Sequence, residues 1–130
     1  AMSLHNYPFI DPPQADPASD RLNFRRMELV QAIMADYGDE DKQLYITETG
    51  WNDHPRFRDA VSPAQRINFT LEMYRYTAEN YPQVEALCLW HFRLPAPTQS
   101  YPDYFTLVTP EFETKPIYDA LQAYARGEIQ

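Results

Sequence analysis

The sequence has one cysteine in 130 residues, Cys88, which excludes an internal disulfide and gives no indication of the compartment. Basic residues are also few: 11 lysines and arginines against 19 aspartates and glutamates give a net charge of -8. No basic run is present to contact the phosphates of a nucleic acid or an anionic membrane surface. No apolar run approaches the roughly 20 residues that a membrane-spanning helix needs. These absences argue against nucleic-acid and membrane partners.

Cofactor motifs are lacking as well. No Gly-x-Gly-x-x-Gly follows any expected strand, so a dinucleotide-binding fold has no support. No Cys pair exists, and His5, Glu48 and His54 lack the i, i+4 helical spacing of a zinc site. We therefore expect neither a metal nor another cofactor. No signal peptide is recognisable and the first residues have the pattern of a strand, so the localisation is not predicted from these residues.

The stretch from Leu44 to Trp51 is the most informative in the chain. It begins as an apolar run typical of a buried parallel strand and ends in Glu48, Gly50 and Trp51. Side chains alternate along a strand, so Leu44, Ile46 and Glu48 are expected on one side. Glycine then allows a sharp turn. A carboxylate is thus expected at the carboxyl end of a strand, where parallel α/β folds place their chemistry.

Three strands and three helices alternate along the sequence. Strands are expected at 2–4, 44–47 and 86–90, and helices at about 20–37, 62–80 and 115–126. Ser62, Pro63 and Gln65 form a capping box with proline at the first helical position. Each connection is long enough for a right-handed crossover, which makes the strands parallel. Residues at helical spacing predict the buried face of the first helix: Leu22, Leu29, Val30, Ile33 and Tyr37, with Arg26 as a polar exception.

A sheet of three parallel strands leaves one face and two edges uncovered. The residues expected on that inner face are apolar: Ile46, Cys88, Trp90 and Phe92. An eight-stranded βα barrel of about 250 residues would cover them. The fold expected from these residues is therefore α/β, a partial (β/α)8 TIM barrel in which residues 1–130 supply the last three βα units. The alternative is a three-layer sheet that closes by dimerisation.

The three strand ends carry residues suited to sugar chemistry: His5 and Tyr7, then Glu48 with Trp51, then Trp90. Retaining glycoside hydrolysis needs an ionised carboxylate that attacks the anomeric carbon, and a carboxylic acid roughly 5 Å away. A tyrosine hydroxyl that donates to Glu48 would stabilise its charged form. An indole offers a flat face to the C–H groups of a pyranose.

These segments resemble the last three units of a clan A glycoside hydrolase barrel, of the cellulase, β-glycosidase or β-1,3-glucanase type. The resemblance rests on His5-Asn6-Tyr7, on Thr-Glu-Thr-Gly-Trp around Glu48, and on Trp90 in Leu-Trp-His-Phe. It implies Glu48 as the nucleophile, with Tyr7 tuning it and His5 positioning it. It also implies that Trp90, Trp51 and Asn6 bind substrate, and that the partner is an oligo- or polysaccharide. The same resemblance makes a secreted or cell-surface location plausible. It also implies that the sheet is closed by the missing N-terminal part of the barrel or by another copy of the chain.

The sequence departs from the family in one respect. The acid/base glutamate of the clan follows an asparagine on the fourth strand, upstream of these segments, and the chain contains no Asn-Glu pair. Glu79-Asn80 has the reverse order at a helix end. The full-length protein is therefore expected to be an enzyme, and this chain alone is expected to be inactive.

Each site residue has a plainer interpretation that the sequence leaves open. Glu48 could simply face water at a strand end, His5 could be a satisfied polar core residue, and Trp90 could fill the core. Stacking and loop packing are equally open for Trp51. At the level of function, the alternatives are a non-catalytic carbohydrate-binding or scaffold module and a transglycosidase that uses the same residues.

Overall fold

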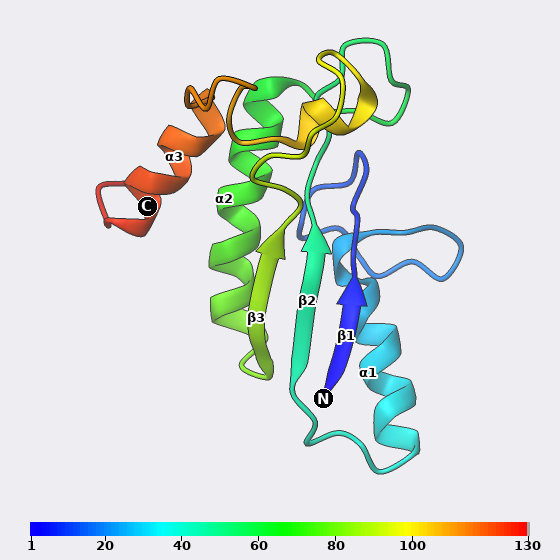
Figure 1. The fold of residues 1–130 in the computed structure, drawn as a ribbon. Helices are drawn as coiled ribbons and strands as arrows, with labels where there is room; N and C mark the ends of the chain where they lie inside the picture. The colour runs from blue at the N-terminus through cyan, green and yellow to red at the C-terminus, as the bar shows by residue number, and fades with distance from the viewer. Residues whose placement is uncertain (130) are drawn as a thin grey trace.

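In the computed structural model, which describes residues 1–129, three parallel strands alternate with helices (Figure 1). The strands are β1 (Met2–His5), β2 (Leu44–Thr49) and β3 (Val84–Leu89), and they form one sheet in the order β1-β2-β3. β2 pairs with both neighbours in parallel. The predicted α/β class, the three strands and their parallel direction are confirmed.

Helices fill the connections between and after the strands. They are the 3-10 helix η1 (Phe24–Arg26), α1 (Met27–Asp36), α2 (Pro63–Asn80), the 3-10 helix η2 (Tyr101–Phe105) and α3 (Pro116–Ala125). The capping box at Ser62 is present as predicted, with Gln65 as its second member. Among residues 1–129, no helix combines the length and the apolar character required to cross a membrane.

The first helix begins later than the sequence predicted, and its buried face differs. Leu22, Ile33 and Tyr37 are 46%, 57% and 83% exposed, whereas Met27 and Met34 are buried. The cause lies in the preceding loop. The guanidinium of Arg26 donates to three backbone carbonyls of that loop. These hydrogen bonds hold the loop in a conformation that is not helical. Because the helix starts only at the end of η1, a different set of residues faces the sheet.

The hydrophobic core lies between the sheet and the helices α1 and α2. Ile46 of β2 is fully buried there beside Phe24, Met27 of α1 and Met73 of α2. The sequence analysis had placed Ile46 on the inner, helix-free face of the sheet, and this was wrong. The helices cover the face that carries Leu44 and Ile46, because those are the largest aliphatic groups of the central strand and their burial stabilises most.

The opposite face of the sheet is open. Its side chains are mostly small or polar, and Ser3, His5, Thr47 and Cys88 are all exposed. The hydroxyls of Ser3 and Thr47 lie 2.9 Å apart and connect β1 with β2. No helix within residues 1–129 covers this face, so the sheet has the uncovered side that the three-strand pattern predicted, although its residues are more polar than expected.

A β-bulge in β2 decides where Glu48 points. Leu4 pairs with Ile46 but His5 pairs with Glu48, so β2 contains one residue more than β1 at this point. The pairing with β3 skips at the same place, from Ile46–Leu87 to Thr49–Leu89. A bulge of this kind leaves one residue unpaired and re-aims the side chains that follow it. The simple alternation that put Glu48 in line with Ile46 was therefore wrong, and Glu48 lies beside His5.

Candidate functional site

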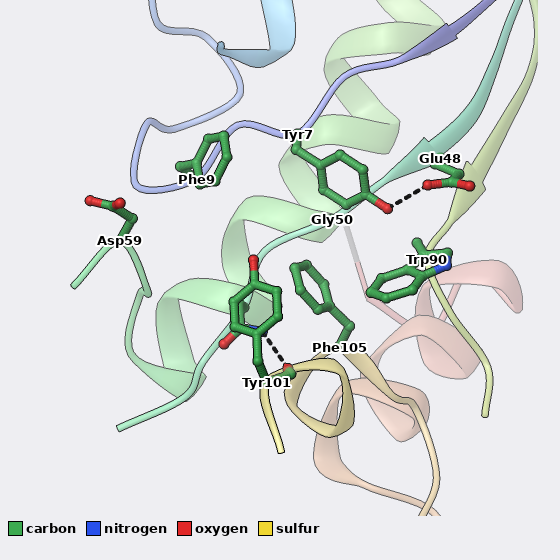
Figure 2. A pocket seen from close by; sticks show the side chains of 9 residues that line it. Tyr7, Phe9, Glu48, Gly50, Asp59, Trp90, Tyr101 and Phe105 are labelled. Carbon is green, nitrogen blue, oxygen red and sulfur yellow. Dashed lines mark hydrogen bonds between the residues drawn. The ribbon is translucent and has the colours of Figure 1, made fainter. Parts of the chain in front are cut away.

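A cavity of about 280 Å³ lies at the carboxyl ends of the strands (Figure 2). Tyr7 from the segment after β1, Glu48 from β2 and Trp90 from the end of β3 bring the three strand ends together in its wall. The remaining walls include Phe9 and Asp59 from loops, and Tyr101 and Phe105 from η2. The cavity is thus lined mainly by aromatic rings, with two carboxylates.

Glu48 is held by two residues of the first strand and its continuation. The Tyr7 hydroxyl donates a hydrogen bond of 2.8 Å to Glu48 Oε2, which confirms the predicted contact. His5 Nδ1 lies 3.5 Å from the same oxygen. The Glu48 side chain is 35% exposed and that of His5 57% exposed, so the carboxylate remains open to a ligand. Glu48 is thereby fixed in orientation without being closed off.

The proton of Tyr7 stays on its oxygen at physiological pH. Burial raises the pKa of Tyr7, and the hydrogen bond to the Glu48 carboxylate raises that pKa further. A tyrosine that keeps its proton is a permanent donor to Glu48. Tyr7 and His5 both contact Oε2 of Glu48, so its other oxygen has no partner among residues 1–129.

Trp90 forms the wall next to Glu48. Its ring packs edge-on against Tyr7 and Phe105, with centroid distances of 6.3 and 5.1 Å. The Trp90 amide donates to the Thr49 carbonyl at 2.8 Å, which ties the ends of β2 and β3 together, and the Trp90–His91 peptide bond is cis. Trp90 is partly exposed, so part of its ring surface can contact a ligand.

Gly50 permits this close approach of the strand ends. Its φ is +146°, a conformation that side-chain-bearing residues rarely adopt. A Cβ at this position would lie 3.2 Å from the Trp90 carbonyl oxygen and 3.7 Å from the Phe105 ring. The glycine that the sequence analysis assigned to a sharp turn therefore also makes room for the cavity wall.

A buried polar network fixes the loop that carries Phe105. Arg66 of α2 is only 4% exposed, and its guanidinium donates to the carbonyls of Phe105 (2.5 Å) and Thr106 (3.1 Å). Asp53 pairs with the same guanidinium at 3.3 Å. Lys115 donates to the Thr106 hydroxyl from the other side. A buried cation that bonds to a loop backbone makes the position of that loop, and of the Phe105 ring, well defined.

Two residues expected to bind substrate lie elsewhere. Trp51 is 1% exposed, packs against Phe69 in the core and donates its indole N–H to the Asp11 carbonyl. Asn6 is 8% exposed, and its amide donates to the Phe24 carbonyl. Neither lines the cavity. Both secure the segment after β1 through backbone carbonyls, so their surroundings correct the substrate-binding prediction and support the loop-packing alternative for Trp51.

Five cavity residues were missed by the sequence analysis: Phe9, Asn52, Asp59, Tyr101 and Phe105. All lie on connections, where no strand or helix period shows which way a side chain points. The one available signal was the aromatic content of the long segment from 93 to 113. Among residues 1–129, no cluster of three or more potential metal ligands is present.

In comparisons with protein-family models, curated proteins and solved structures, nothing matches this chain.

Proposed function

We propose that the chain is the C-terminal part of a retaining glycoside hydrolase that acts on β-linked glycans, with Glu48 as the nucleophile. The observation that carries the proposal is the 2.8 Å hydrogen bond from Tyr7 to Glu48 inside a cavity walled by Trp90. The motif resemblance supplies the reaction class. The cavity provides what a sugar ring needs, namely flat aromatic surfaces beside a polar group.

In the proposed reaction, Glu48 attacks the anomeric carbon while the glycosidic bond breaks. A glycosyl ester of Glu48 forms, and water later cleaves it. Tyr7 orients Glu48 through its hydrogen bond. His5 steadies the same oxygen from the open side. Trp90 lies under the sugar, and the cavity residues Tyr101 and Phe105 reduce the access of water to the ester.

The leaving oxygen must gain a proton as the bond breaks, and general acid catalysis of this kind contributes about 10²–10⁴ in rate. The family resemblance assigns that acid to a glutamate on a fourth strand. The open face of the sheet and the unpaired edges of β1 and β3 support a closed barrel in which further strands cover them. A second copy of the chain is the alternative cover.

The proposal is tested with Glu48→Gln in the intact protein that contains this chain. The amide is isosteric with the carboxylate but is a poor nucleophile, so turnover of aryl β-glycosides should be abolished while the unfolding transition stays in place. An activated aryl leaving group needs little acid, so this substrate isolates the attack by Glu48. Glu79→Gln at the exposed end of α2 is the matched control and should keep full activity.

Turnover of the Glu48→Gln variant at the wild-type rate would show that Glu48 is not the nucleophile, and the site would have to be reassigned. If neither protein turns over any glycoside but both bind saccharides, the non-catalytic binding module is the better description. An upstream strand of the intact protein that ends in an Asn-Glu pair would argue against that alternative, because the pair would supply the acid. Analysis of the products distinguishes hydrolysis from transfer to an acceptor sugar.

A further inference from the structure

A second cavity adjoins the one at Glu48. It has a volume of about 260 Å³ and is lined in part by Asp11, Arg21 and Leu22. Phe9 and Asp59 belong to the walls of both cavities, so the two share a boundary. In Figure 2, Phe9 and Asp59 lie across the first cavity from Glu48 and Trp90. The two cavities together therefore extend from Glu48 past Phe9 toward Arg21.

Phe9 holds an unusual backbone conformation at this boundary. Its φ is +52°, which is uncommon for any residue other than glycine, asparagine or aspartate. A turn maintains it, since the Asp11 amide donates to the Pro8 carbonyl at 3.0 Å. Local strain of this kind persists where the surroundings over-determine it, and it often marks a ligand site. Here it places an aromatic ring between the two cavities.

The second cavity combines apolar and charged surfaces. Ile10 and Leu22 are 55% and 46% exposed, although both are large aliphatic residues. Arg21 and Asp11 form an ion pair of 3.1 Å, and the Arg21 side chain is 58% exposed. Within residues 1–129, the Asp59 carboxylate accepts no hydrogen bond, and Arg58 is its nearest cation at 3.8 Å. Asp59 is therefore free to accept hydrogen bonds from a ligand.

Such a surface fits a neutral sugar. A pyranose presents C–H groups to an aromatic or aliphatic wall and hydroxyl groups to carboxylates and guanidinium groups. Two carboxylates and one guanidinium line the cavity, with Arg58 beside Asp59, so there is no excess positive charge to attract acidic sugars. We infer that the cavity formed by Phe9, Asp59, Asp11 and Arg21 binds a second sugar unit of a neutral β-linked oligosaccharide, whose reacting unit lies at Glu48. This inference rests on the proposed function and specifies its substrate as an oligosaccharide.

The test measures binding to the Glu48→Gln variant of the intact protein, which leaves the ligand uncleaved. The probes are glucose and its β-1,4- and β-1,3-linked di- and trisaccharides, measured by titration calorimetry. Affinity should rise from glucose to a disaccharide or trisaccharide. A lost hydrogen bond or aromatic contact of this kind corresponds to about tenfold in affinity. Phe9→Ala and Asp59→Asn, at the boundary of the two cavities, should therefore weaken the binding of the longer probes by about that much more than the binding of glucose.

Matched controls lie far from the cavity: Phe112→Ala at an exposed aromatic residue and Asp36→Asn at the exposed end of α1. Both should keep the dependence of affinity on saccharide length. Equal affinity for short and long saccharides, or a dependence unchanged by Phe9→Ala and Asp59→Asn, would overturn the second sugar position. Glucose binding that depends on Trp90 would still support the site at Glu48 in that case. Turnover of aryl β-glycosides by the wild type without a gain in affinity for the longer probes would overturn the second sugar position alone. Absence of both turnover and binding would overturn both proposals.

Discussion

The two faces of the sheet differ in how deeply their side chains are buried and in how polar they are. On β2, Ile46 is fully buried against α1 and α2, while the next residue, Thr47, is exposed on the open face. The covered face holds the large aliphatic groups whose burial stabilises the fold. The open face holds small or polar groups that contribute little to stability. The comparison indicates that the helices stabilise the sheet and leave its open side and carboxyl edge free for polar chemistry.

Glu48 belongs to the open side only because of the bulge in β2. Without the extra residue, strict alternation would direct the carboxylate of Glu48 into the core beside Ile46, where a buried charge costs several kcal/mol. With it, Thr49 is buried instead and its hydroxyl donates to the Asn6 carbonyl at 2.6 Å. One inserted residue thus moves a charge from a costly position to one where Tyr7 and His5 meet it.

The largest difference in stability is expected between two single substitutions at adjacent residues of β2. Ile46→Ala removes a fully buried side chain and should lower the free energy of unfolding by about 2–5 kcal/mol. Thr47→Ala on the open face should change it by no more than about 0.5 kcal/mol, because its hydrogen bond to Ser3 is exposed. Urea unfolding of this chain measures both. Similar losses for the two variants would show that the open face is covered in solution.

A smaller effect is expected where the two strand ends meet, at Gly50. Gly50→Ala introduces a Cβ at a φ of +146° and 3.2 Å from the Trp90 carbonyl oxygen, so a loss of about 3 kcal/mol is expected. Gly38→Ala is the matched control: its φ is +74°, but no atom lies within 4 Å of the added Cβ. It should cost only about 1 kcal/mol.

The same unfolding experiment, followed by tryptophan fluorescence, separates backbone strain from the contact at Trp90. The emission of the folded Gly50→Ala protein should shift, since Trp90 must move, while Gly38→Ala should leave it unchanged. Equal destabilisation and unchanged spectra for both variants would mean that the contact with Trp90 has no effect beyond the backbone conformation.

Elements with a local signal could be predicted from the sequence. The capping box at Ser62, the three parallel strands and the Tyr7–Glu48 contact all follow from residue type, spacing and strand-end geometry. The position of Glu48 on the open face could not be predicted, because a bulge depends on the pairing of two partner strands and leaves no period in β2 alone. Hydrogen bonds between a side chain and a distant loop gave no signal in the sequence either. Arg26 delays the start of α1 because it binds carbonyls of the preceding loop, and no helical pattern in the sequence indicates this contact.

Trp51 and Asn6 show the same limit at the site. Both lie within two residues of the end of a strand and have side chains that bind sugars in many proteins, so the sequence analysis predicted them at the rim. Their partners are backbone carbonyls of the segment after β1 and of the turn before α1. Such partners depend on how a loop folds back, which residue type does not specify. Phe9 was missed for the complementary reason, because a φ of +52° is not predictable for phenylalanine.

The smallest effect is expected at His91, which follows Trp90 but does not line the first cavity. Its Nε2–H donates to the Pro102 carbonyl at 3.1 Å, and its Nδ1 is buried without a partner among residues 1–129. Burial lowers the pKa of His91 below its ordinary value of 6.5. The hydrogen bond to Pro102 opposes this shift, and the positive charges of Arg93, Arg66 and Lys115 add to it.

Below pH 6.5 the unfolded chain therefore takes up a proton at His91 that the folded protein still resists. The unfolded state binds more protons in this window, so stability rises with pH there and falls as the solution is acidified from 6.5 toward the lower pKa of the folded state. His91→Gln retains an N–H donor for the Pro102 carbonyl but cannot titrate. Urea unfolding at about pH 7.5 and about pH 5.5 should show a smaller acid-induced loss for the variant than for the wild type. If both lost the same free energy of unfolding, His91 would be charged as readily in the folded state as in the unfolded chain, and its burial would not lower its pKa.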